Sequence, residues 1–121
     1  MSGLNILIVD DDPDFADGLA EVMELQGHRV EVACTCAGGL ATARRALHGV
    51  ALIDIGLPDS NGVECLRGLR ELAPDMVCFL MTGYSADHIA AQGIEAGALR
   101  VLTKPVDLED LLRALAEIPP G

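Results

Sequence analysis

Three aspartates, Asp10, Asp11 and Asp12, directly follow an apolar run in the segment ILIVDDDPD, and Asp54 ends a second apolar run, VALID. Carboxylates gathered at one place repel one another unless a proton or a cation neutralises them. An all-oxygen site with few protein ligands suits Mg²⁺, which retains several of its waters. The residue types therefore indicate a cation site, provided that the fold brings the two segments together.

Two further apolar runs end on polar side chains of a different kind. Thr82 follows MVCFLM, and Thr103 and Lys104 follow the short run at 99–102. Mg²⁺, an ammonium group and a hydroxyl together can hold the three oxygens of a phosphoryl group. A carboxylate such as Asp54 can then attack phosphorus and form an acyl phosphate. This combination favours phosphoryl transfer over other chemistry.

The elements that must position these residues alternate along the chain. Continuous apolar runs predict buried strands, and apolar residues at helical spacing predict helices between them. Asp12 and Asp107 are expected to cap helices, the first of which begins at Pro13. We expect strands at 4–9, 29–33, 50–54, 76–81 and 99–102, and helices at 13–26, 38–47, 63–72, 86–96 and 108–115. Five βα units predict a doubly wound parallel sheet of the α/β class, with ligands at the carboxyl ends of its strands.

Composition limits the classes of function. The 121 residues predict one domain, 1–121, and contain no apolar run long enough for a membrane helix. The N-terminus lacks the features of a signal peptide, so we expect a cytoplasmic protein without membrane attachment. Eight basic and nineteen acidic residues give a formal net charge of −11, which argues against direct nucleic-acid binding.

Cysteine and histidine side chains show no spacing typical of a metal site. The cysteines lie at positions 34, 36, 65 and 78. The pair in CTC is closer than the usual C-x2-C, so buried thiols in a reducing compartment are a better interpretation than ligands or disulfides. His28, His48 and His88 lie near predicted helix ends, where we expect solvated or capping roles.

Four motifs together resemble a known family. ILIVDDDP, DIGLPDSNG, MTG and LTKP occur in this order and at distances similar to those in the receiver domain of two-component response regulators. Each motif alone is weak, but the four in register at four strand ends are specific. The resemblance covers about residues 4–117, with 118–121 expected to start a linker. It implies a flavodoxin-like (βα)5 fold with strand order 2-1-3-4-5.

The resemblance also implies a role for each acidic residue. Asp54 matches the phosphoacceptor. Asp11 matches the direct ligand of Mg²⁺ (or Mn²⁺), Asp10 acts largely through water, and the backbone carbonyl of Gly56 matches the third protein ligand.

The other motifs imply a switch. Thr82 matches the hydroxyl that bonds the phosphoryl group, Lys104 matches the lysine that pairs with it, and the Lys104–Pro105 bond is expected to be cis. The implied phosphoryl donor is a histidine kinase or a histidine phosphotransfer protein, docking on the first helix. The fourth helix, fifth strand and fifth helix would signal to a C-terminal output domain or a downstream protein. Phosphorylation-dependent dimerisation is a further option.

Three positions depart from the family pattern or modulate it. Many receivers carry a switching Tyr or Phe where this chain has Val101, which is too small for that movement. Tyr84 lies two residues after Thr82, and we hypothesise that it gates the site or shields the acyl phosphate from water. Gly56 supplies no side chain to orient an attacking water, so we expect slow loss of the phosphoryl group.

Two other functions remain open. Asp10 and Asp12 supply the D-x-D of a Mg²⁺-dependent phosphatase or phosphotransferase, although Asp14 stands where that class has Thr or Val, and 121 residues leave no room for a cap domain. A receiver that no longer accepts phosphate would instead be a pure interaction module. These alternatives differ in which aspartate takes up a phosphoryl group, or in whether any aspartate does.

Overall fold

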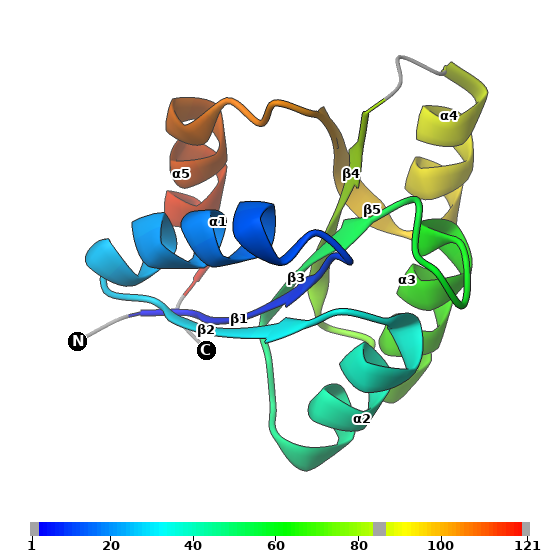
Figure 1. Cartoon of the computed structure of the whole chain (residues 1–121), viewed down its shortest axis with the longest axis horizontal. Coiled ribbons are helices and arrows are strands. Elements are labelled where there is room, and N and C mark those ends of the chain that lie inside the picture. Colours follow the sequence, from blue (N-terminus) through cyan, green and yellow to red (C-terminus); the bar gives the residue numbers. More distant parts are fainter. Residues whose placement is uncertain (1–2, 84–86, 120–121) are drawn as a thin grey trace.

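The computed structural model describes residues 3–83 and 87–119. The elements are β1 (Asn5–Val9), α1 (Pro13–Leu25), β2 (Arg29–Ala33), α2 (Cys36–Arg45), β3 (Val50–Asp54), α3 (Gly62–Leu72), β4 (Val77–Thr82), α4 (Asp87–Ala96), β5 (Ala98–Thr103) and α5 (Leu108–Ala116). The five strands form one parallel sheet in the order β2-β1-β3-β4-β5 (Figure 1). The predicted α/β fold and its implied strand order are confirmed.

Helices cover both faces of this sheet, and each face has its own core. Ile6 and Ile8 of β1 belong to the core under α1 and α5, whereas Leu7 and Val9 belong to the core under α2 and α3 (Figure 1). Successive side chains of a strand point to opposite faces. A strand covered on both sides must therefore be apolar at every position, which explains the continuous apolar runs of the sequence.

Side-chain caps fix where the helices begin. The amide of Phe15 donates to Asp12 Oδ1 at 3.2 Å, and Pro13 occupies the first helical turn. Asp107 caps α5 in the same way. The predicted start of the second helix at residue 38 is wrong, because Thr35 accepts the Gly38 amide and α2 begins at Cys36.

Two of the minor expectations also fail. His48 is 4% exposed, and its Nε2 lies 2.8 Å from Glu31 Oε1, so it is a buried partner of β2 and not a solvated residue.

All four cysteines are free, but Cys34 is exposed, whereas the other three are buried. Burial raises the pKa of Cys78 to about 11, so that thiol stays protonated at neutral pH. Among the described helices, none combines the length and apolar character needed to cross a bilayer.

Candidate functional site

The carboxyl ends of β1 and β3 place three carboxylates together. These strands are neighbours, with Val9 paired to Ile53, so Asp10 and Asp54 emerge side by side. Oxygens of Asp10, Asp11 and Asp54 all lie within 4.8 Å of one another. Asp10 is fully buried and Asp54 is 8% exposed, whereas Asp11 lies at the surface. The predicted convergence of the two acidic segments is therefore present in the structure.

Lys104 reaches into the same cluster from the end of β5. Its Nζ lies 2.8 Å from Asp10 Oδ2 and 3.0 Å from Asp54 Oδ1. Burial on its own lowers the pKa of Lys104, but the hydrogen bonds and charges of the two carboxylates together outweigh it and raise that pKa above its ordinary value. The lysine is therefore charged throughout the neutral range.

The donor set fits a divalent cation. Three carboxylates and one ammonium group give this partly buried site a formal charge of −2. Concentrated negative charge of this kind favours either protonation or a cation. The donors are all oxygens, as hard cations such as Mg²⁺ and Ca²⁺ prefer, and exposed Asp11 leaves one side open to solvent.

The loop after Asp54 turns back on itself directly beside the cluster. Gly56 forms an antiparallel bridge with Asn61, and the amide of Gly62 donates to Ile55 O at 2.8 Å. A Cβ at Gly62 would lie 2.5 Å from Asp54 O, so only glycine allows α3 to start this close to β3. A Cβ at Gly56 would lie 3.8 Å from Asp54 Oδ2, so a side chain at this position would be in van der Waals contact with the carboxylate.

The remaining residues singled out in the sequence lie at or near this edge of the sheet. Thr82 ends β4 and is 3% exposed, and its carbonyl accepts the Lys104 amide at 2.7 Å. The Lys104–Pro105 peptide bond is cis. Val101 is partly buried in β5, facing α4, where a Cβ at Gly93 would lie 3.3 Å from Val101 Cγ2. Tyr84 lies outside the described residues.

One aromatic residue of the site was not found from the sequence. The Phe15 ring lies under Lys104, with Nζ 4.4 Å from the ring centroid, a geometry typical of a cation–π interaction. Its apolar spacing with Leu19 is typical of a core residue of α1, so no contact with a charged side chain could be predicted for it. The signal that the sequence offers is its position in the first turn of α1, four residues after Asp11.

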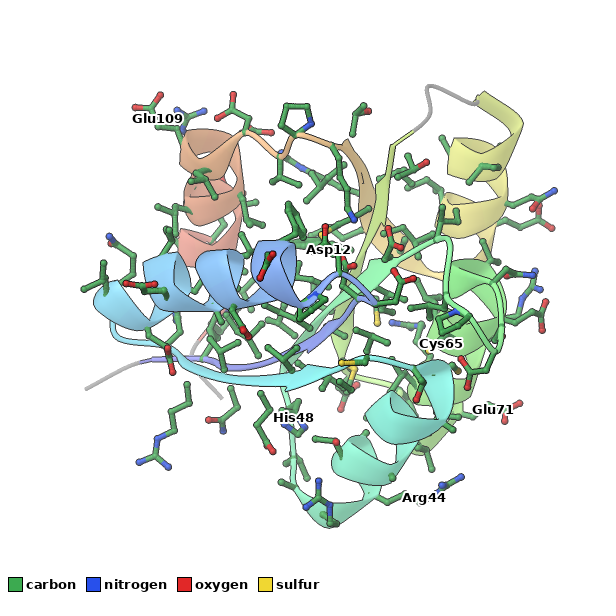
Figure 2. All side chains as sticks on the ribbon, in the orientation of Figure 1. Asp12, Arg44, His48, Cys65, Glu71 and Glu109 are labelled. Atoms are coloured by element: carbon green, nitrogen blue, oxygen red, sulfur yellow. The ribbon has the colours of Figure 1, made fainter. Side chains whose placement is uncertain are left out.

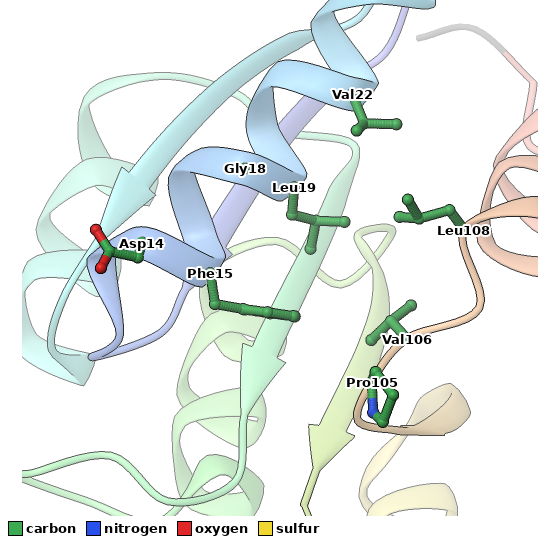
Figure 3. Close-up of a pocket in the computed structure, with 8 residues that line it drawn as sticks. All are labelled: Asp14, Phe15, Gly18, Leu19, Val22, Pro105, Val106 and Leu108. Atoms are coloured by element: carbon green, nitrogen blue, oxygen red, sulfur yellow. The ribbon is translucent and has the colours of Figure 1, made fainter.

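Phe15 also belongs to an apolar groove between α1 and the segment that leads into α5. The groove has a volume of about 290 Å³. Its apolar side chains face one another across the gap (Figure 3): Phe15, Leu19 and Val22 on one side, and Pro105, Val106 and Leu108 on the other. Lys104 therefore lies between a charged cluster and an apolar groove.

Comparisons with known proteins identify the family of the chain. The family model of the response regulator receiver domain matches residues 6–116. The photosynthetic apparatus regulatory protein RegA of Rhodobacter capsulatus is 38% identical over 114 residues, which are 94% of this chain and 62% of RegA. The acid tolerance regulatory protein ActR of Rhizobium meliloti (strain 1021) is 37% identical over 115 residues, 95% of this chain and 59% of ActR. The chain thus spans about three-fifths of these relatives.

Solved structures show the same arrangement of elements. A CheY-like receiver domain protein from Methanospirillum hungatei JF-1 superposes with a TM-score of 0.90 at 38% identity, covering 96% of this chain and 93% of that one. A response regulator from Burkholderia pseudomallei, solved with a phosphorylated aspartic acid, a calcium ion and citrate, gives a TM-score of 0.87 at 31% identity, covering 93% of this chain and 66% of that one. The chain belongs to the response regulator receiver domain family.

Proposed function

We propose that this chain is a phosphorylation-controlled switch in which Asp54 accepts a phosphoryl group from a phosphohistidine. The observation that supports it most is the cluster itself: Asp10, Asp11 and Asp54 lie together with Lys104 at the carboxyl edge of a receiver fold. A receiver domain is a signalling switch and not an enzyme that turns over a separate substrate. Its own chemistry would be limited to accepting and losing the phosphoryl group.

The residues divide the work of that reaction. An oxygen of Asp54 attacks phosphorus, and the bond from phosphorus to the histidine nitrogen breaks. Lys104, already 3.0 Å from Asp54 Oδ1, neutralises charge on the incoming group. The Thr82 hydroxyl then bonds a phosphoryl oxygen. Gly56 adds no side chain beside the carboxylate, so hydrolysis of the acyl phosphate is expected to be slow.

The same residues define the metal requirement of the proposal. We assign Mg²⁺ (or Mn²⁺) to Asp11, Asp54 and the Gly56 carbonyl, with Asp10 acting through water. A bound divalent cation would lower the repulsion between the phosphoryl oxygens and the carboxylates. The all-oxygen donor set and its formal charge of −2 support this assignment.

The donor protein, a histidine kinase or a histidine phosphotransfer protein, is proposed to dock on α1. The apolar groove of about 290 Å³ supports this site because it opens next to the cluster, and Phe15 takes part in both (Figure 3). An apolar helix face of the donor can fill such a groove. Docking there would bring a phosphohistidine toward Asp54.

We propose that the phosphorylation signal leaves the domain through the surface formed by α4, β5 and α5. Exposed Ile94 and Leu99 lie in this region, at 52% and 55% exposure, and give it apolar surface for an output domain, a downstream protein or a second copy. The relatives extend well beyond the matched region, which supports an output domain outside residues 4–117, with 118–121 starting the linker. Free cysteines suit the reducing cytoplasm.

The test is phosphorylation by acetyl phosphate with and without Mg²⁺, followed by mass spectrometry of the intact protein and its peptides. We expect one phosphoryl group on Asp54, no product in EDTA, and at least about a hundredfold slower labelling of Asp54→Asn, because the nucleophile is lost. Ser60→Ala, in the same loop, is the control and is expected to label normally.

Each alternative gives its own result. Labelling on Asp10 or Asp12 would indicate a phosphatase or phosphotransferase with its nucleophile after β1. Neither labelling nor any spectral response to beryllofluoride with Mg²⁺ would indicate an interaction module that does not accept phosphate.

A further inference from the structure

We propose that Asp59 is a positioning residue, which fastens the loop carrying Gly56 to the N-terminus of α2 and thereby sets the affinity of the cation site. This inference rests on the proposed function, because it concerns the loop whose Gly56 carbonyl is assigned to the metal. Among the described residues, the hydrogen bonds of Asp59 go to α2 and not to the carboxylate cluster.

The contact joins two segments that are distant in sequence. The amide of Cys36 donates to Asp59 Oδ1 at 2.9 Å, and the amide of Ala37 donates to Asp59 Oδ2 at 3.0 Å. Both carboxylate oxygens are therefore used, and both bonds go to the first turn of α2. A carboxylate at this end of a helix also interacts favourably with the helix dipole.

Asp59 remains ionised in this position. The amides of Ala37 and Cys36 bond the charged form and lower the pKa of the Asp59 carboxyl below its ordinary value. Hydrogen bonds to a charged acceptor are shorter and stronger than those between neutral groups. Two of them from one planar carboxylate fix the orientation of the residue as well as its position.

The rest of the loop shows why this attachment affects Gly56. Two hydrogen bonds already hold the ends of the loop. The Ile55 amide donates to Met81 O at 2.9 Å, and the Gly62 amide donates to Ile55 O at 2.8 Å. Leu57 is 9% exposed and anchors one side of the turn in the core. Gly56 stands between these anchors, opposite Asn61 in the antiparallel bridge, and as a glycine its backbone has fewer steric limits than those of its neighbours. The direction of its carbonyl therefore depends on how firmly the far side of the turn is held, and Asp59 lies on that side.

The simpler explanation is that Asp59 only caps α2. The chain offers a matched control for this, because Thr35 caps the same helix end through a bond from the Gly38 amide to Thr35 Oγ1 at 2.9 Å. Thr35→Ala removes a cap from α2 and leaves the loop of Gly56 untouched. Asp59→Ala removes a cap and also releases the loop. Asp59→Asn keeps one carbonyl oxygen as acceptor and removes the charge.

The experiment measures Mg²⁺ affinity by calorimetry in the wild-type protein and the three variants, together with amide hydrogen exchange without metal. Outer partners of metal ligands typically change affinity by tenfold or more; since Asp59 acts through the backbone, we expect Asp59→Ala to weaken Mg²⁺ binding about threefold or more. Asp59→Asn should lie between it and wild type, and Thr35→Ala should match wild type. The Gly62 amide should exchange faster in Asp59→Ala than in Thr35→Ala.

The outcomes separate this inference from the proposed function. Equal Mg²⁺ affinity in wild type and Asp59→Ala, or an equal loss in Asp59→Ala and Thr35→Ala, would overturn the role of Asp59 while leaving the phosphorylation of Asp54 intact. A wild-type protein that neither binds Mg²⁺ nor becomes labelled would overturn both.

Discussion

Two polar clusters, each with a buried side chain at its centre, lie at opposite ends of the sheet, and they are built differently. At the carboxyl ends of β1, β3 and β5, Asp10 and Asp54 share the ammonium group of Lys104. Toward the amino ends, His48, labelled in Figure 2, pairs with Glu31 of β2. The Gly49 amide bonds Asn5 O there at 3.0 Å, which holds the His48 segment against β1.

The difference lies in what each cluster leaves uncompensated. The first keeps a formal charge of −2 and carboxylate oxygens within 4.8 Å of one another, so a cation or a phosphoryl group with its metal can complete it. The second pairs His48 Nε2 with Glu31, whose carboxylate is half exposed to water. Among the described residues, His48 Nδ1 is buried without a hydrogen-bond partner, so this cluster leaves a ring nitrogen unpaired and not a group of carboxylates. A buried polar residue therefore does not by itself indicate a functional site. Excess charge gathered from several strand ends is the stronger sign.

Among the changes that compare the two clusters, the largest effect is expected from Asp11→Asn. Asp11 is exposed, so its removal costs no packing, but it takes one charge and one ligand oxygen from the cation site. We expect Mg²⁺ affinity to fall about tenfold or more, since ligand charge sets affinity at such sites. The metal-free protein should be no less stable, because repulsion within the cluster falls. Calorimetric titration and thermal unfolding measure the two quantities.

Asp12→Asn is the matched control for this change. It removes the same unit charge from the neighbouring position, and asparagine caps α1 as well as aspartate does. Equal losses of Mg²⁺ affinity in both variants would mean that general surface charge, and not the carboxylate of Asp11, attracts the cation.

His48→Ala in the second cluster should have the opposite pattern, a loss of stability without a loss of Mg²⁺ affinity. The ring is 4% exposed, and its loss removes the bond to Glu31 and leaves a cavity beside β2. We expect the free energy of unfolding to fall by about 1–3 kcal/mol, with Mg²⁺ affinity unchanged. Urea denaturation and calorimetry measure these. Glu31→Gln, which keeps an oxygen opposite the ring, should cost less, and a change in Mg²⁺ affinity in either variant would break the division between the clusters.

The sequence predicted the first cluster and not the second, and the reason is geometric. The carboxyl ends of parallel strands meet at one edge, so Asp10, Asp54 and Lys104 could be placed together once the strand ends were known and the family resemblance had supplied the strand order. The burial of His48 depends on how the segment after α2 returns under β1, which no periodicity encodes. For the same reason the sequence did not reveal the bonds of Asp59, which span 22 and 23 residues and follow from the packing of α2 beside the loop.

The smallest effect, from Phe15→Leu, tests whether the apolar groove and the charged cluster act as one site. Leucine still fills the groove, but it lacks the ring face that lies 4.4 Å from Lys104 Nζ. A partly exposed cation–π contact contributes about 0.5–1 kcal/mol, so labelling of Asp54 by acetyl phosphate should slow by about two- to fivefold. This small donor needs no docking, so a slower rate reports on Lys104 and not on the groove. Leu25→Ala, an exposed change at the far end of α1, is the control and should label at the wild-type rate. An unchanged rate in Phe15→Leu would limit Phe15 to donor binding and leave Lys104 held by Asp10 and Asp54 alone.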